Sequence, residues 1–102
     1  MKAPRARAPS SRAQAETALY QALLTLRNES ECKQFFEDLC TPAELEALSD
    51  RWAVVGHLRD GLPYRKIHEL TGVSVTTIGR VARFLSRGNG GYRTVLERMA
   101  ER

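Results

Sequence analysis

The feature that most constrains the fold is a glycine between two short helical patterns, in the stretch YRKIHELTGVSVTTIGRVARFL at residues 64–85. Ahead of the glycine, Ile67 and Leu70 indicate one apolar face of a short helix that begins after Pro63. Gly72 can adopt the left-handed conformation that ends a helix, because it has no Cβ atom to clash. The pattern therefore predicts two short helices joined by a tight turn.

The residues after the turn complete the pattern of a helix-turn-helix. Val73 is an apolar residue placed to fill the corner between the two helices, and Ser74 can cap the second helix. The inner face of that helix is predicted to consist of Ile78, Ala82 and Leu85. We therefore predict a helix-turn-helix at about residues 63–86, whose second helix can enter the major groove of DNA. The alternative is an ordinary helical hairpin that has no role in DNA binding.

The outward residues of the second helix are candidates for contacts with DNA. Val75 can touch a thymine methyl group, and Thr76 can hydrogen-bond to a base or a phosphate. Gly79 leaves bare backbone that permits close approach of DNA or of a neighbouring helix. Nearby basic side chains are candidates for phosphate contacts. The complete set of DNA-binding candidates is Ser74, Val75, Thr76, Thr77, Gly79, Arg80 and Arg83, with Arg65, Lys66 and Arg87.

The charge of the chain is concentrated where this motif lies. The net charge is +4, but residues 13–60 contain nine acids and four bases, whereas residues 61–102 contain eight bases and three acids. Residues 1–12 add four bases and no acid. A basic C-terminal half suits a phosphate backbone. The alternative is a solvated face with no partner.

Two further helical patterns lie near the N-terminal end of the chain, well before the helix-turn-helix. From about Ala13, apolar residues recur at three- and four-residue spacing over an arc wide enough to pack on two sides, which indicates a dimer. A second pattern begins at Ser30, which is expected to cap that helix.

The third helix has the clearest start signal. Thr41 is placed as the N-cap, Pro42 as the first helical residue and Glu44 as the residue that completes a capping box. Asp60 and Gly61 supply a stop signal. The predicted apolar face consists of Leu45, Leu48, Trp52, Val55 and Leu58.

These patterns predict an all-α fold. A glycine-rich turn, GNGG at residues 88–91, precedes a final helix from about Tyr92 to Ala100. Residues 13–102 are therefore expected to form one helical domain for DNA binding and dimerisation. Residues 1–12 lack apolar periodicity and are predicted to form a disordered basic tail, either a DNA-binding arm or a solubilising segment.

Several function classes are disfavoured. Cys32 and Cys40 would lie roughly 12 Å apart on one helix, which is too far for a disulfide, so both are expected to be reduced and buried. The two histidines have no metal-ligand spacing with them; His57 is expected near a helix end, and His68 facing solvent or DNA. We predict no catalytic or metal site and no enzyme activity. Without a membrane-length apolar run or a signal peptide, a cytoplasmic location is expected.

The run TPAELEAL at residues 41–48, Arg51 and the helix-turn-helix ending at Arg80 resemble the Trp repressor superfamily. The stretch SRGNGGY at residues 86–92 is similar to the YerC/YecD type of Trp-repressor-related proteins. The resemblance covers about residues 15–98. It implies an all-helical, intertwined homodimer with two helix-turn-helix heads.

The resemblance also implies a possible effector site. Tryptophan-binding members of the superfamily hold the amino acid with two arginines, which match Arg51 and Arg80. Guanidinium groups can pair with a carboxylate and stack on an aromatic ring. This chain has Val81 where those repressors have glycine, and its turn is one residue shorter, so neither tryptophan nor another cofactor is predicted. Some other small effector, or a role of both arginines in binding acidic residues or phosphate, stays open.

The sequence thus predicts a sequence-specific transcriptional regulator, a repressor, that binds a two-fold symmetric operator in double-stranded DNA as a dimer. The alternative is a protein–protein interaction module that keeps the helical fold as a scaffold.

Overall fold

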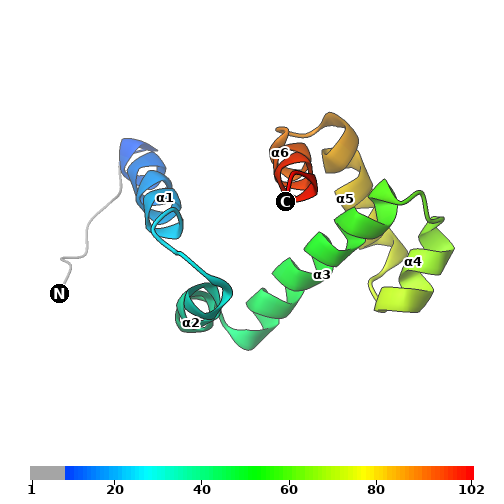
Figure 1. Ribbon diagram of the computed structural model, residues 1–102, viewed down its shortest axis with the longest axis horizontal. Coiled ribbons are helices and arrows are strands. Elements are labelled where there is room, and N and C mark those ends of the chain that lie inside the picture. Colours follow the sequence, from blue (N-terminus) through cyan, green and yellow to red (C-terminus); the bar gives the residue numbers. More distant parts are fainter. Residues whose placement is uncertain (1–8) are drawn as a thin grey trace. The chain divides into compact units, whose positions relative to one another are not determined.

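The computed structural model describes residues 9–102, with side chains from residue 11 onward, and this part of the chain is entirely α-helical (Figure 1). The helices are α1 (Pro9–Leu23), α2 (Glu29–Leu39), α3 (Pro42–Arg59), α4 (Tyr64–Thr71), α5 (Val75–Arg87) and α6 (Gly91–Ala100). The predicted all-α class is confirmed. One compact unit ends at Cys40 and a second comprises Thr41–Arg102. Among the helices described, none has the length and apolar character needed to cross a membrane.

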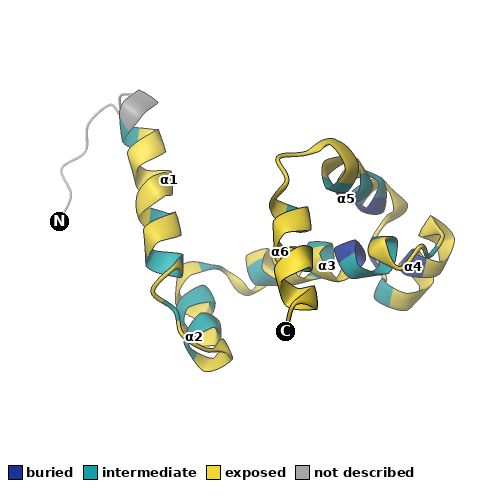
Figure 2. Ribbon diagram, turned by 45° about the horizontal axis from the view of Figure 1, so that its top comes forward, coloured by how far each residue is buried: buried dark blue, intermediate teal, exposed yellow. Residues whose placement is uncertain are grey.

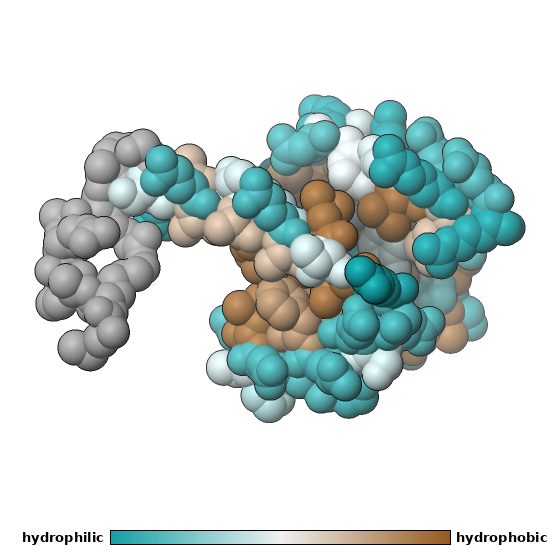
Figure 3. Space-filling model, turned by 60° about the vertical axis from the view of Figure 1, so that its left-hand side comes forward, coloured by the Kyte–Doolittle hydropathy of each residue, from teal (hydrophilic) through white to brown (hydrophobic). Residues whose placement is uncertain are grey.

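In the unit that contains α1 and α2, no residue from position 11 onward is buried, and several large apolar side chains are exposed (Figure 2). Tyr20 is 55% exposed, Leu24 85% and Leu39 52%. Apolar side chains are visible among hydrophilic ones on the surface in Figure 3. α1 begins at Pro9, four residues before the predicted start, and residues 1–8 of the predicted tail lie outside the described residues. The broad apolar arc predicted for the first helix is therefore not covered by α2.

The start of α2 differs from the prediction. Asn28, not Ser30, is the N-cap, and its side chain accepts a hydrogen bond of 2.9 Å from the backbone N–H of Glu31. The Glu31 carboxylate in turn accepts a hydrogen bond from the N–H of Arg27. Asn28 stands two residues before Ser30, and asparagine is as good an N-cap as serine. Its amide oxygen reaches the N–H three residues further on, so the helix begins earlier than predicted. Both cysteines of this unit are free, as predicted, but they are partly rather than fully buried.

The start of α3 is as predicted. The Thr41 hydroxyl accepts a hydrogen bond of 3.1 Å from the N–H of Glu44, and the Glu44 carboxylate accepts one of 2.8 Å from the N–H of Thr41. Pro42 is the first helical residue, where its missing N–H costs nothing. The helix ends at Arg59, followed by Gly61 with a φ of +81°. Local capping therefore fixes both ends of the helix that supports the rest of the unit.

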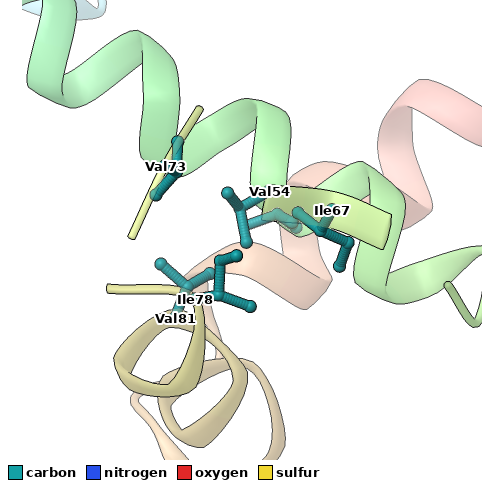
Figure 4. Packing of buried hydrophobic residues seen from close by; sticks show 6 residues of the cluster. Val54, Ile67, Val73, Ile78 and Val81 are labelled. Atoms are coloured by element: carbon teal, nitrogen blue, oxygen red, sulfur yellow. The ribbon is translucent and has the colours of Figure 1, made fainter. Parts of the chain in front are cut away.

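The core of the second unit is a small aliphatic cluster between α3, α4 and α5 (Figures 1 and 4). Its six members are at most 7% exposed, and they are Val54, Val55, Ile67, Val73, Ile78 and Val81. Within the described residues, no polar or charged residue is buried. The unit is therefore held together by apolar burial, at roughly 1.5–3 kcal/mol for each fully buried aliphatic side chain.

The predicted inner faces of α3 and α5 are partly wrong. Leu48 and Trp52 are 41% and 37% exposed, while Val54, which was not predicted, is fully buried. Leu48 lies in the N-terminal half of α3, which α4 and α5 leave uncovered in this unit (Figure 1). Trp52 lies in the C-terminal half, but its ring is beside that of Tyr92 on α6 and not in the aliphatic cluster. On α5, Val81 is in the core, whereas Ala82 and Leu85 are only partly buried.

The junction between α5 and α6 is fixed by an arginine. The Arg93 guanidinium donates hydrogen bonds to the carbonyl oxygens of Leu85, at 3.2 Å, and Ser86, at 3.1 Å. These carbonyls belong to the last turn of α5, which has no helical N–H partner for them. The indole of Trp52 and the ring of Tyr92 lie 6.2 Å apart between centroids. α6 is therefore tied both to the end of α5 and to α3.

Gly88 is the position in this junction where a side chain cannot fit. A Cβ atom there would lie 2.3 Å from the carbonyl oxygen of Phe84, which is backbone and cannot yield. We expect Gly88→Ala to lower the free energy of unfolding by about 1–3 kcal/mol. Gly91→Ala is the matched control, because a Cβ at that position meets nothing within 4 Å. Urea unfolding of both variants tests this, and equal stability of the two would contradict it.

Candidate nucleic-acid interface

The turn between α4 and α5 has the predicted geometry. Gly72 has a φ of +74°, in the left-handed region, and its N–H donates to the carbonyl of His68 at 2.8 Å. A Cβ atom at this glycine would meet nothing within 4 Å, so the backbone conformation and not lack of space favours glycine. Val73 is 7% exposed and fills the corner. The predicted helix-turn-helix is therefore present.

Two polar side chains that the sequence analysis did not assign to the turn hold it in place. The Thr71 hydroxyl donates to the carbonyl of Ile67 at 2.7 Å and accepts from the N–H of Val73 at 3.1 Å. Nδ1 of His68 lies 2.7 Å from the carbonyl oxygen of Val73, and because a carbonyl can only accept, Nδ1 is the donor. His68 is exposed, as predicted, and this hydrogen bond adds a role in the turn that the sequence analysis did not assign to it. The spacing of His68 and Thr71 just before Gly72 is the signal that could have revealed both.

The first turn of α5 presents two side chains outward. Ser74 caps the helix, since its hydroxyl accepts a hydrogen bond of 3.1 Å from the N–H of Thr77. The Ser74 hydroxyl also donates to the Thr77 hydroxyl at 3.0 Å, so these two candidates form one local pair. Val75 is 53% exposed and Thr76 is also exposed. One end of α5 thus offers an apolar group and a hydroxyl to a partner.

The basic candidates surround this helix and all are exposed. They are Arg65, Lys66, Arg80, Arg83 and Arg87. The salt bridges found in residues 11–102 are Lys33–Glu37 and Arg59–Asp60, so none of the five has an acidic partner there. Their positive charge is available to anions.

Phe84 is a member of this surface that the sequence analysis did not name. Its ring centroid lies 5.0 Å from Cζ of Arg80 and 5.4 Å from Cζ of Arg83. Both distances are within the range of a cation–π contact. The ring is 37% exposed. The i,i+4 spacing of Arg80 and Phe84 places these two side chains on one face of α5, but no spacing rule predicts the contact with the adjacent Arg83.

The structure shows different environments for the two arginines of the predicted effector site. Arg51 is partly buried on α3, whereas Arg80 is exposed and its guanidinium lies at the Phe84 ring. Val81, the residue that replaces glycine, is 1% exposed and belongs to the aliphatic cluster on α3. The valine is therefore part of the packing that holds α5.

Comparison with known proteins agrees with this geometry. The family model described as Trp repressor protein matches residues 14–100. The chain belongs to the Trp repressor family. It is 43% identical to the Bacillus subtilis protein YerC over 83 residues, which cover 81% of this chain and 80% of YerC.

Two crystal structures of family members have the same fold. A TrpR-like protein from Eubacterium eligens superposes with a TM-score of 0.82 at 46% identity, covering 85% of this chain and 90% of that one. A candidate Trp repressor from Staphylococcus aureus gives a TM-score of 0.81 at 44% identity, covering 85% and 87%. The Trp repressor family is one of DNA-binding transcription regulators and not of enzymes. The helix-turn-helix is thus the candidate site of DNA contact.

A substitution at Gly79 is expected to change protein stability and DNA affinity in opposite directions. A Cβ atom there would meet only the ring edge of Tyr64, at 4.0 Å, which is ordinary contact. We expect Gly79→Ala to raise the free energy of unfolding by up to about 1 kcal/mol, because alanine is the better helix former. DNA affinity should fall at the same time if the bare backbone lies against DNA. Unfolding curves and DNA titrations of one preparation test both, and unchanged affinity would remove Gly79 from the interface.

Proposed function

We propose that this Trp repressor family member is a cytoplasmic, sequence-specific repressor that binds a two-fold symmetric DNA operator as a homodimer. The observation that carries the proposal is that one face of α5 is packed in the core while its N-terminal end is exposed. Ile78 and Val81 fix its inner face in the core, while Val75 and Thr76 remain exposed at its N-terminal end. In helix-turn-helix proteins, the N-terminal residues of the second helix contact base edges in the major groove.

The two exposed side chains of the first turn are suited to base contacts. A hydroxyl such as that of Thr76 can hydrogen-bond to a base edge, and Val75 offers an apolar surface for a thymine methyl group. The unpaired basic side chains around α5 are suited to phosphates, which position the protein without specifying sequence. In the proposed interface, the first turn therefore reads sequence and the basic rim supplies affinity.

Exposed apolar side chains support the proposed homodimer. They occur in both units: besides Tyr20, Leu24 and Leu39, Leu48 is 41% exposed, Trp52 37%, Val95 44% and Met99 49%. A protein of this size that exposes so many large apolar groups has a candidate interaction surface. A second copy of the chain is the proposed partner, because two symmetric heads would match the two half-sites of an operator.

We further propose that the protein binds DNA without tryptophan. The supporting observation is that Val81 lies in the aliphatic core and helps to fix α5 on α3. The helix is therefore held by side chains of the protein itself. A small effector of another kind, acting through Arg51 or Arg80, would modulate this state and is not required for it.

Selection of random duplex DNA by the full-length protein at about 150 mM salt tests the proposal. We expect enrichment of a palindromic motif with half-sites separated by about one helical turn. A repeat with added tryptophan should enrich the same motif to the same extent. The absence of any enriched motif in both selections would overturn the proposal and favour the protein–protein interaction scaffold.

Single substitutions separate sequence reading from general affinity. Thr76→Ala should reduce discrimination between the operator and a one-base variant by about 1 kcal/mol or more, because one base contact is lost. Arg87→Ala, the charge control, should weaken binding to both sequences equally and lower the slope of log affinity against log salt by about one. Fluorescence anisotropy at several salt concentrations measures both. Equal loss of discrimination in both variants would argue against this division of roles.

The dimer is tested at the end of α1. Leu24 directly follows this helix, and Leu24→Glu places a charge where an apolar side chain is 85% exposed in the single chain. If a second copy covers this position, burial of the unpaired charge should shift the protein toward monomer and weaken operator binding. Gln21→Glu adds the same charge at an exposed polar position in the last turn of α1 and is the control. Sedimentation equilibrium measures the association, and a wild-type protein that is monomeric at micromolar concentration would contradict the dimer.

A further inference from the structure

We propose that Phe84 is a positioning residue of the DNA interface, which holds the guanidinium groups of Arg80 and Arg83 ready for phosphate contacts. The inference rests on the proposed DNA-binding function and adds a residue to it that carries no charge and no hydrogen-bonding group. The arrangement consists of one partly exposed ring with two guanidinium carbons at 5.0 Å and 5.4 Å from its centroid.

The chemistry of the guanidinium group allows it to contact the ring and a phosphate at once. Its five N–H donors point outward in the plane of the group. Contact of Cζ with an aromatic ring therefore leaves donors at the rim of the group free for phosphate oxygens. An arginine that is held in this way loses less side-chain conformational entropy when it binds than a freely rotating one does.

The backbone that carries the Phe84 ring is held by hydrogen bonds. The carbonyl of Phe84 accepts a hydrogen bond of 2.9 Å from the N–H of Gly88, at the end of α5. The next two carbonyls, of Leu85 and Ser86, accept from the Arg93 guanidinium. The backbone that carries the ring is thus anchored at each of these three positions. In contrast, Arg80 and Arg83 have no acidic partner among residues 11–102, so the ring is the contact that restrains them.

The position of the cluster fits phosphates rather than base edges. Phe84 lies in the last turn of α5, whereas the exposed side chains proposed to contact base edges are in its first turn. Because the contacts already exist in the free protein, they raise affinity only by restricting the free arginines, and the strength of two exposed cation–π contacts limits this gain to roughly fivefold to thirtyfold.

The experiment compares Phe84→Leu with Phe84→Tyr in the full-length protein, on the selected operator and on unrelated duplex DNA. Leucine removes the ring but keeps an apolar side chain, so affinity for both DNAs should fall about tenfold. The charges are unchanged, so the salt slope should stay that of the wild type. Tyrosine retains a ring and should restore most of the affinity. Sedimentation and thermal unfolding must show the same association and fold for all three proteins.

A double-mutant cycle distinguishes a positioning role of Phe84 from a merely structural one, because only a positioning role depends on the two arginines. In a background that carries Arg80→Ala and Arg83→Ala, Phe84→Leu should have no further effect on DNA affinity. Equal losses in both backgrounds would overturn the positioning role, as would wild-type affinity of Phe84→Leu. If Phe84→Leu does not fold, Phe84→Met takes its place in the same cycle. Failure of the wild-type protein to bind any DNA would instead overturn the proposed function, and this inference with it.

Discussion

The burial of α5 against α3 is the interaction on which the rest of the DNA-binding unit depends. Ile78 and Val81 from α5 share one cluster with Val54 and Val55 from α3, and all four are at most 1% exposed. Aliphatic contacts of this kind are strong but have no preferred direction. The orientation of α5 relative to α4 is instead set by the turn that joins them, with its left-handed Gly72 and its side-chain hydrogen bonds.

Both ends of α5 are fixed by polar contacts that leave its outer face free. Ser74 satisfies an N–H group at the start, and Arg93 satisfies two carbonyls at the end. The apolar inner face and the capped ends together make α5 a rigid support, while Val75, Thr76 and the basic side chains stay accessible. Binding surfaces on rigid elements place their side chains more accurately than loops do. A homodimer would present two such supports, and their spacing would then select the operator.

Features that depend on residues close together in the chain were predicted best from the sequence. The capping box at Thr41 and the turn at Gly72 were predicted correctly, because each depends on residues within four positions along the chain. Ser30 was assigned wrongly as a cap because a competing acceptor, Asn28, stands two residues earlier. The N-terminal end of α1 was predicted four residues late, at a position where no apolar pattern marks the helix.

The sequence by itself determined the helices, the helix-turn-helix and the family, since capping, periodicity and turn chemistry are local properties of the chain. Only the tertiary structure decided which half of α3 is covered, and hence that Val54 is buried while Leu48 is exposed. Periodicity defines a face of a helix but not the length of it that a neighbour covers. The clustering of two arginines at Phe84 likewise depends on which rotamers the folded surface allows, and no spacing rule along the chain fixes these.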